Sequence, residues 1–288
     1  MEFLRLLEGL RTPFMDTLMS LITQLGDELF FMVIAITMFW CIDKRRGYYL
    51  LSVSFVGTLI NQFLKLWFRI PRPWVLDPDF TIVESAREAA TGYSFPSGHT
   101  QNFATWSTLI ALKIKKLSVW IVTAMLILLV AFSRMFLGAH YPMDVVAGAL
   151  LGVLFSVVGN AIYDKTEDKN RLFLWATVIF TPFIIWFVIF PNPLYADFFK
   201  VYGMIAGAFA GLKFEEKYSP LSYNVPIFKK VIRVVLGIMI ALVFKAGLKT
   251  LFATDIVRLG LICDALRYFI LLFIMVGLCP LLFKKLNL

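Results

Sequence analysis

The chain has 288 residues, of which 60% are apolar and 16% are charged, and its mean hydropathy is +0.80. Soluble domains are usually about 45–50% apolar and about 25% charged. The composition therefore excludes an ordinary cytosolic enzyme, a secreted disulfide scaffold and a disordered protein, and it indicates an integral membrane protein. The formal net charge of +9 comes from Lys and Arg in short gaps between apolar runs, which favours a positive-inside bias over nucleic-acid binding.

The N-terminal segment, residues 1–28, is predicted to form short helices ahead of the main bundle. Glu2–Leu10 is amphipathic, which is typical of a helix lying in the membrane interface. Thr12 and Pro13 then form the N-cap and first-turn pair that commonly opens a helix. We therefore expect an interfacial helix followed by a second short helix.

Nine apolar runs follow, and they predict an all-α membrane protein. A span requires about 20 apolar residues, or fewer where neighbouring protein shields it. The runs are Leu29–Ile42, Tyr48–Phe68, Gln101–Ile114, Ser118–Phe136, Val145–Tyr163, Leu172–Phe190, Phe198–Leu212, Val231–Leu248 and Leu259–Phe283. An odd number of spans would place the N-terminus outside and the C-terminus inside.

Basic residues in alternating gaps predict the orientation in the membrane. These cations are Lys44, Arg45, Arg46, Lys113, Lys115, Lys116, Lys165, Lys169, Arg171, Lys213, Lys217, Lys229, Lys230, Lys284 and Lys285. Because cytoplasmic loops carry an excess of Lys and Arg, we expect these gaps on the cytoplasmic side of a plasma membrane. The outer side then holds Ile70–Gly98, Leu137–Met143, Pro191–Asp197 and Phe252–Arg258.

The outer gap Ile70–Gly98 is the longest, and a helix-like stretch, Thr81–Ala90, lies within it. Loops longer than about 12–15 residues are usually functional or disordered. Lys65, Arg69 and Arg72 stand at its start and oppose the positive-inside trend. Snorkelling explains one or two such cations, whereas three beside a long loop indicate an anion site.

The chain contains two histidines, and the first, His99, follows Ser97 and Gly98 at the predicted start of a helix. The first turn of a helix has unpaired N–H groups and a positive dipole end. Gly98 allows a close backbone approach and Ser97 adds a hydroxyl, which suits a phosphate. The alternative is a plain N-cap at Ser97 with an interfacial His99.

The second histidine, His140, lies between Arg134 and Asp144 at the edge of an apolar run. A guanidinium at the end of a membrane helix is costly unless it is paired, so it is a candidate functional group. Asp144 stands four residues after His140 and can accept a hydrogen bond from its ring, which leaves the other nitrogen free to act as a nucleophile. The alternative is an N-cap at Asp144 beside an interfacial His140.

Three motifs in this order resemble the signature of the type 2 phosphatidic acid phosphatase (PAP2) superfamily. Residues 65–73 read KLWFRIPRP, residues 96–99 read PSGH, and residues 133–144 read SRMFLGAHYPMD. The superfamily includes membrane lipid phosphatases, undecaprenyl-pyrophosphate phosphatases, glucose-6-phosphatases and soluble vanadium haloperoxidases. The resemblance implies a PAP2-type six-helix transmembrane core over residues 29–190, with about three additional C-terminal transmembrane helices over residues 191–288.

The resemblance also implies roles for the motif residues. His140 would attack phosphorus and form a phosphohistidine, Asp144 would orient His140, and His99 would protonate the leaving oxygen and then activate water. The phosphate-binding set would be Lys65, Arg72, Ser97, Gly98 and Arg134. The family works without a metal or another cofactor, so none is expected.

The expected function is metal-independent hydrolysis of a lipid phosphate or pyrophosphate on the extracytoplasmic side of the membrane. Phosphatidic acid, undecaprenyl pyrophosphate, phosphatidylglycerol phosphate and a sphingoid-base phosphate all satisfy the motifs, which contact only the phosphate. One alternative is a lipid phosphotransferase that passes the phosphoryl group to another acceptor. The other is a non-catalytic lipid transporter or scaffold.

The C-terminal residues 191–288 lie beyond the motifs. They carry the charged residues Lys245, Lys249, Asp255, Arg258, Asp264 and Arg267. These residues form either pairs that fix helix packing or a second polar groove that admits a lipid headgroup. Glycines repeat every four residues at Gly203, Gly207 and Gly211, which allows close helix approach and leaves packing within the chain and homodimerisation as two interpretations.

Overall fold

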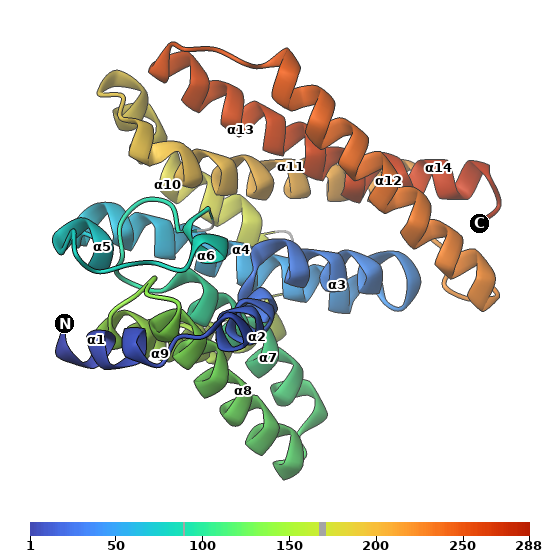
Figure 1. The fold of residues 1–288 in the computed structure, drawn as a ribbon. Coiled ribbons are helices and arrows are strands. Elements are labelled where there is room, and N and C mark those ends of the chain that lie inside the picture. The colour runs from blue at the N-terminus through green and yellow to red at the C-terminus, as the bar shows by residue number, and fades with distance from the viewer. Residues whose placement is uncertain (89, 167–170) are drawn as a thin grey trace. The chain divides into compact units, whose positions relative to one another are not determined.

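The computed structural model describes residues 1–88, 90–166 and 171–288, and the regular structure of these residues is entirely helical (Figure 1). The helices are α1 (Glu2–Gly9), α2 (Pro13–Thr23), η1 (Gln24–Gly26), α3 (Glu28–Cys41), α4 (Lys44–Phe68), α5 (Pro73–Leu76), α6 (Glu84–Arg87), α7 (Gly98–Ile114), α8 (Leu117–Phe136), α9 (Pro142–Lys165), α10 (Arg171–Ile189), η2 (Pro193–Tyr195), α11 (Ala196–Tyr218), α12 (Ile227–Leu251), α13 (Val257–Phe273), η3 (Ile274–Leu278) and α14 (Cys279–Lys285). The all-α prediction is therefore confirmed. Lys169 of the predicted cytoplasmic gaps lies outside the described residues.

Several helices are long and apolar enough to cross a membrane, so the chain is a multi-span membrane protein. Among the described residues, five segments qualify: Lys44–Leu76, Leu117–Phe136, Pro142–Lys165, Ile227–Leu251 and Val257–Lys285. Pro13–Gly26 and Glu28–Cys41 would make a sixth if the two together count as one broken span. Each of the nine apolar runs coincides with a helix, but spanning by α7, α10 and α11 stays a prediction.

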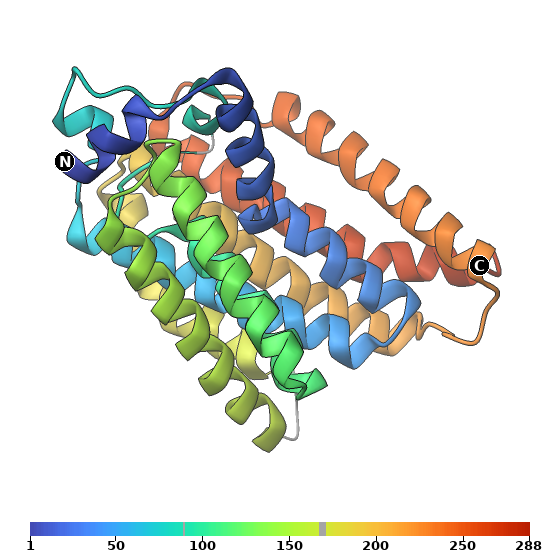
Figure 2. The ribbon, with the colours of Figure 1, turned by 60° about the horizontal axis from the view of Figure 1, so that its bottom comes forward.

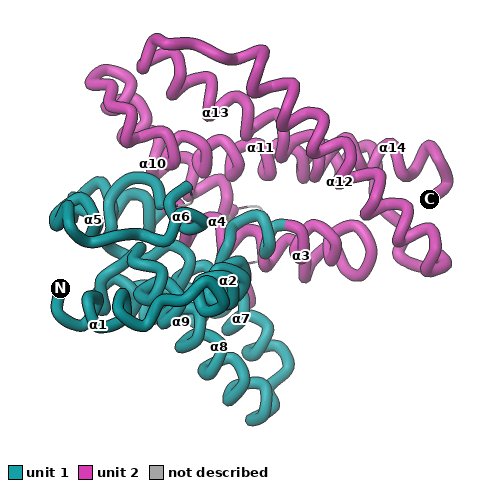
Figure 3. The backbone as a smooth tube through the Cα atoms, viewed as in Figure 1, with its two compact units in different colours: residues 1–32, 60–162 teal, residues 33–59, 163–288 magenta. Residues whose placement is uncertain are grey.

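The chain forms two compact units, which are described separately (Figure 3). Unit 1 contains residues 1–32 and 60–162, and unit 2 contains residues 33–59 and 163–288. In unit 1, α7 and α8 pack side by side, and the N-terminal helices α1 and α2 pack on α8 (Figure 2). In unit 2, α11 packs along α13.

The start of unit 1 follows the predicted capping pattern. The Thr12 hydroxyl accepts a hydrogen bond from the Met15 amide at 3.3 Å, and Pro13 occupies the first turn of α2. The predicted helix over Thr81–Ala90 was too long, because in the described residues only Glu84–Arg87 is helical, and Ala89 lies outside them. A second short helix, α5, begins at Pro73 directly after Arg72.

Glycines bring α9 onto the first turns of α7 in unit 1. A Cβ atom on Gly148 would lie 2.6 Å from the Ser97 carbonyl oxygen, and one on Gly152 would lie 2.6 Å from the Gln101 carbonyl oxygen. Both distances are shorter than real Cβ contacts, so no larger residue fits without a shift of backbone. This close approach places the helix that carries Asp144 against the helix that begins after Ser97.

The repeated glycines of α11 serve helix packing inside unit 2. A Cβ atom on Gly203 would lie 2.1 Å from the Ala265 carbonyl oxygen, and one on Gly207 would lie 2.2 Å from that of Phe269. Small residues let two helix backbones approach in this way inside a membrane. The four-residue spacing of glycines on α11 therefore lets α13 of the same chain pack closely against it.

Replacing Gly207 with Leu is expected to lower the Tm of the protein in detergent. The new side chain would overlap the Phe269 backbone, and overpacking of this kind costs about 1–3 kcal/mol. Gly247→Leu on α12 is the matched control, because nothing lies within 4 Å of its Cβ position. Thermal unfolding of both variants tests the prediction, and equal Tm values would contradict it.

Candidate active site

The three motifs meet within unit 1, where each candidate residue stands at the end of a helix or in the adjoining loop. Lys65 is in the last turn of α4, Arg72 precedes α5, and Ser97, Gly98 and His99 open α7. Arg134 is in the last turn of α8, His140 is in the loop before α9, and Asp144 is in the first turn of α9. The cations and the His140–Asp144 pair are buried, with exposed fractions from 0% to 6%.

His140 lies between a guanidinium and a carboxylate. Its Nε2 atom is 3.3 Å from Nη1 of Arg72, and its Nδ1 atom is 3.3 Å from Oδ2 of Asp144. Arginine is always protonated and only donates hydrogen bonds, so Nε2 is the acceptor and the proton of a neutral ring lies on Nδ1. The Nε2 lone pair therefore points into the cationic site, as a nucleophile requires.

Asp144 forms hydrogen bonds both with His140 and with the PSGH motif. Its Oδ2 atom accepts hydrogen bonds from the Tyr141 amide at 2.9 Å and from the Ser94 hydroxyl. Its main-chain carbonyl accepts from the Ser97 amide at 2.9 Å. Asp144 is the third residue of α9 and therefore not its N-cap, which the alternative interpretation expected; its carboxylate instead accepts from the amide just ahead of the helix and also contacts His140.

Sequence reasoning missed Ser94, which lies only three residues before Ser97. Its side chain is fully buried, and its hydroxyl lies 3.4 Å from Nδ1 of His140 as well as bonding Asp144. The polar pair Tyr93-Ser94, separated from PSGH by Phe95 alone, was the available signal. Ser94 therefore joins Asp144 in contacting the His140 ring.

Arg72 and Lys65 hold the end of the long loop between α4 and α7. The Nε atom of Arg72 donates to the Gly92 carbonyl at 3.0 Å, and its Nη1 atom donates to the Ala139 carbonyl at 3.1 Å. The Nζ atom of Lys65 donates to the Tyr93 carbonyl at 2.8 Å. Both cations are thus fixed in place beside His140, and a bound anion would meet charges that are already positioned.

The first turn of α7 completes the anion site. Ser97 is the N-cap, and its hydroxyl accepts from the Thr100 amide. His99 lies within electrostatic range of Arg134, Arg72 and Lys65. Amides at a helix start beside buried cations are a typical phosphate-binding arrangement.

Two residues grouped with the motifs direct their side-chain hydrogen bonds elsewhere. Arg69 was expected to contribute to the anion site with Lys65 and Arg72, but α4 ends at Phe68 and Arg69 has a left-handed backbone with φ of 52°. Its guanidinium is exposed and donates to the Leu66 carbonyl. Ser133 precedes Arg134 in its motif, yet its hydroxyl donates to the Val130 carbonyl within α8 at 2.7 Å.

The pKa of His140 is held well below its ordinary value of about 6.5, first by burial and then by the charges of Arg72, Lys65 and Arg134. We therefore expect the ring to be neutral at pH 6.5 in the ligand-free protein. Because the unfolded chain binds this proton more readily, His140 makes the protein less stable as the pH falls below about 6.5.

NMR of protein labelled with ¹⁵N-histidine measures this pKa directly, because the chain has only two histidines. The His99→Gln variant assigns the signals by leaving His140 alone. A titration midpoint at or above 6.5 would contradict the prediction.

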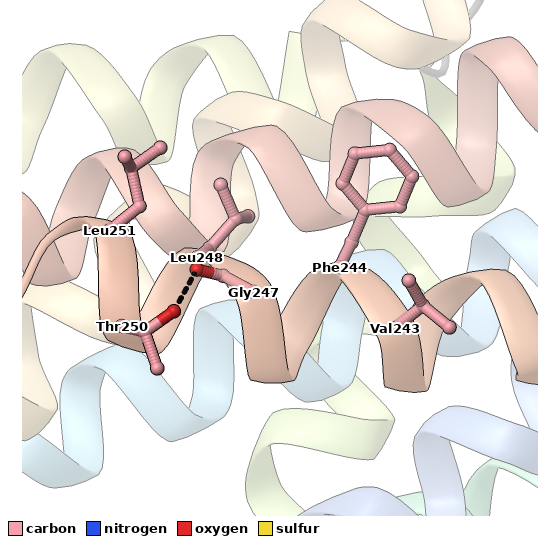
Figure 4. Close-up of a pocket in the computed structure, with 6 residues that line it drawn as sticks. All are labelled: Val243, Phe244, Gly247, Leu248, Thr250 and Leu251. Carbon is pink, nitrogen blue, oxygen red and sulfur yellow. Dashed lines mark hydrogen bonds between the residues drawn. The ribbon is translucent and has the colours of Figure 1, made fainter.

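No group of three or more His, Cys, Asp or Glu side chains is arranged to hold a metal ion in the part of the chain that the structure describes. In unit 2, Arg267 pairs with Asp264 of the same helix, α13, at 3.1 Å, and this contact decides neither interpretation of these charges. Lys245 and Lys249 are exposed on α12. The pocket on this helix is lined by Val243, Phe244, Gly247, Leu248, Thr250 and Leu251, so its described lining is uncharged (Figure 4).

Comparisons with known proteins match both halves of the chain. Residues 46–168 match the PAP2 superfamily, and residues 199–288 match the transmembrane extension of PAP2 superfamily phosphatases. Phosphatidylglycerophosphatase B of Bacillus subtilis is 32% identical over 173 residues, which cover 55% of this chain and 80% of the relative.

A second relative aligns over more of the chain. Dihydrosphingosine 1-phosphate phosphatase of Schizosaccharomyces pombe is 25% identical over 268 residues, which cover 83% of this chain and 63% of the relative. Among solved structures, a transmembrane PAP2 type phosphatidylglycerolphosphate phosphatase from Bacillus subtilis is 28% identical, covers 57% of this chain and 84% of its own, and has a TM-score of 0.47.

Proposed function

Because the chain belongs to the PAP2 superfamily, whose relatives are membrane lipid phosphatases, we propose that it hydrolyses a lipid phosphate or pyrophosphate through a phosphohistidine at His140, without a metal. The observation that carries this proposal is the position of the His140 ring. Its Nε2 atom is 3.3 Å from Arg72 and its Nδ1 atom is 3.3 Å from Asp144, which prepares a neutral nucleophile inside a cationic site.

In the first step, the Nε2 lone pair attacks phosphorus, a P–N bond forms and the P–O bond to the lipid breaks. His99 gives its proton to the departing lipid oxygen. The charge that develops on the phosphoryl oxygens is stabilised by Lys65, Arg72 and Arg134, with the Ser97 hydroxyl and the Gly98 amide.

In the second step, His99 removes a proton from water as the water oxygen attacks phosphorus. The P–N bond breaks, its electron pair returns to Nε2 of His140, and inorganic phosphate leaves. Asp144 and Ser94 keep the proton on Nδ1 throughout and stabilise the positive ring of the intermediate, as the carboxylate does in a serine-hydrolase triad.

The substrate class follows from the membrane and the relatives. The proposed substrate is an amphiphile whose phosphate reaches the site at headgroup level while its tail stays in the bilayer. The relatives act on a phosphatidylglycerophosphate and on a dihydrosphingosine 1-phosphate by their names. Basic residues in alternating gaps support a plasma membrane with the site on the extracytoplasmic side.

Phosphate release by purified protein in detergent with EDTA tests the proposal. The panel is phosphatidic acid, phosphatidylglycerol phosphate, sphingosine 1-phosphate and undecaprenyl pyrophosphate. Release from at least one lipid in EDTA is the expected result. Consumption of a lipid phosphate without release of free phosphate would instead indicate a phosphotransferase. If none of the four lipids is consumed, both activities are contradicted.

A further inference from the structure

The N-terminal helices, which precede the region matched to the PAP2 superfamily at residues 46–168, reach the candidate active site of unit 1. Arg134 is 1% exposed, and its Nη1 atom donates to the Thr23 hydroxyl at 3.0 Å. Thr23 ends α2 and is 3% exposed. A phosphate-binding guanidinium of the third motif is therefore held by a residue from outside all three motifs.

Two nitrogen atoms of the Arg134 guanidinium are left for a ligand by the part of the chain that the structure describes. Its Nε and Nη2 atoms are buried and have no hydrogen-bond partner among the described residues. A guanidinium is planar and rigid, so fixing one N–H sets the directions of the others. The Thr23 contact therefore helps to set the directions in which the N–H groups of Nε and Nη2 point.

The adjoining residue Gly26 packs against the catalytic helix α7. A Cβ atom on Gly26 would lie 2.5 Å from the His99 carbonyl oxygen and 3.0 Å from the His99 Cβ atom. The chain therefore needs glycine here to come this close, and the N-terminal segment contacts both the Arg134 side chain and the backbone of His99.

Arg11 anchors the same segment beside the His140 loop. Its Nε atom donates to the Phe136 carbonyl at 2.9 Å, and its Nη1 atom donates to the Thr81 carbonyl at 2.9 Å. Gly138 passes beneath this guanidinium with a φ of 81°, and a Cβ atom there would lie 2.7 Å from Nη2 of Arg11. The segment is thus fixed at one end by Arg11, beside the loop that leads to His140, and at the other end by the contacts of Thr23 with Arg134 and of Gly26 with His99.

We propose that Thr23 is a positioning residue for the phosphate-binding guanidinium of Arg134, which makes the α2–η1 segment part of the active site. The proposal rests on the proposed function and deepens it. It assigns to the N-terminal segment a role in binding the phosphoryl oxygens, in addition to packing on α8. Thr23 itself does not contact the phosphate.

Thr23→Val removes the hydroxyl and keeps the shape of the side chain. We expect kcat/KM for the best lipid phosphate to fall about 10- to 100-fold, because a small misplacement of a positioned group has effects of this size. Thr23→Ser keeps the oxygen and should restore activity to within about threefold of the unchanged protein. Thr17→Val is the matched control, since the Thr17 hydroxyl donates to the Pro13 carbonyl on the exposed side of the same helix.

A second measurement separates this proposal from the proposed function. Inorganic phosphate should raise the Tm of the folded protein by mass action, and Thr23→Val should require a higher phosphate concentration for the same shift while Thr17→Val should not. This comparison remains decisive if no lipid of the panel is hydrolysed. If Thr23→Val does not fold, Thr23→Ala removes the same oxygen with less crowding.

The outcomes are distinct. Loss in Thr23→Val with recovery in Thr23→Ser supports the positioning role. If Thr23→Val and Thr17→Val have equal kcat/KM values and need the same phosphate concentration for the same rise in Tm, the proposal is wrong. A lower Tm in Thr23→Val, with no change in the phosphate concentration needed for a given Tm shift, would assign Thr23 to packing alone and overturn the proposal.

Discussion

His140→Asn is expected to reduce phosphate release by about 10⁴-fold or more, because the variant lacks the atom that attacks phosphorus. The shorter amide keeps a polar group beside Arg72 and Asp144, so the protein should still fold. Release of phosphate from the best lipid, measured in detergent with EDTA, gives the result. Activity near that of the unchanged protein would mean that His140 is not the nucleophile.

The His99→Gln variant distinguishes the two histidines within the same experiment. An aryl phosphate with a good leaving group does not require an acid for the first step, whereas the second step still requires a base for water. We therefore expect a rapid burst of the aryl alcohol followed by slow turnover, with phosphate retained on the protein. His140→Asn should show no burst, and a burst there would contradict the assignment.

Arg72→Ala is expected to cause the second large effect, on both stability and turnover. The variant removes the donors for the carbonyls of Gly92 and Ala139 and for Nε2 of His140. Unsatisfied buried acceptors cost about 1–3 kcal/mol each, so we expect the free energy of unfolding to fall by about 3 kcal/mol and phosphate release to fall about 10³-fold.

Arg72→Lys separates charge from geometry. Lysine keeps the positive charge but lacks the planar fork that reaches two carbonyls and the histidine together. We expect about 10²-fold slower turnover with a smaller loss of Tm than in Arg72→Ala. Arg69→Lys is the matched control, because Arg69 is exposed and donates only to the nearby Leu66 carbonyl among the described residues. A similar loss in both lysine variants would contradict the special role of Arg72.

Much of this architecture was predictable from the sequence. Apolar runs of sufficient length become helices because the bilayer leaves backbone groups no other partners, and the all-α prediction and the membership of the PAP2 superfamily are confirmed. The residues of the three motifs meet in unit 1, since each motif ends or begins a helix. Their catalytic roles stay predictions until the variants are measured.

The local failures have local physical causes. Arg69 follows Lys65 at helical spacing, but a helix ends where the backbone changes conformation, and the residue at φ of 52° leaves the helix face. The helix predicted over Thr81–Ala90 is observed only at Glu84–Arg87. Helix propensity does not by itself set the ends of a helix, and here the Val83 amide donates to the Leu137 carbonyl, outside the helix.

The long-range contacts were beyond sequence reasoning. Thr23 and Arg134 are 111 residues apart, and Arg11 and Phe136 are 125 apart. No periodicity or spacing connects such pairs, because only the packing of α2 on α8 brings them together. Ser94 differs, since its place beside PSGH could have marked it as a candidate.

Asp144 uses different atoms for its two connections. The carboxylate contacts His140 and Ser94, whereas the main-chain oxygen receives the Ser97 amide. The Ser97 contact between the two motif segments therefore does not use the side chain at this position, whereas the Tyr141 amide and the Ser94 hydroxyl do. Asp144→Asn removes the charge beside the nucleophile but keeps a side-chain oxygen and the main-chain contact, so the electrostatic part of catalysis can be measured here apart from the architectural part.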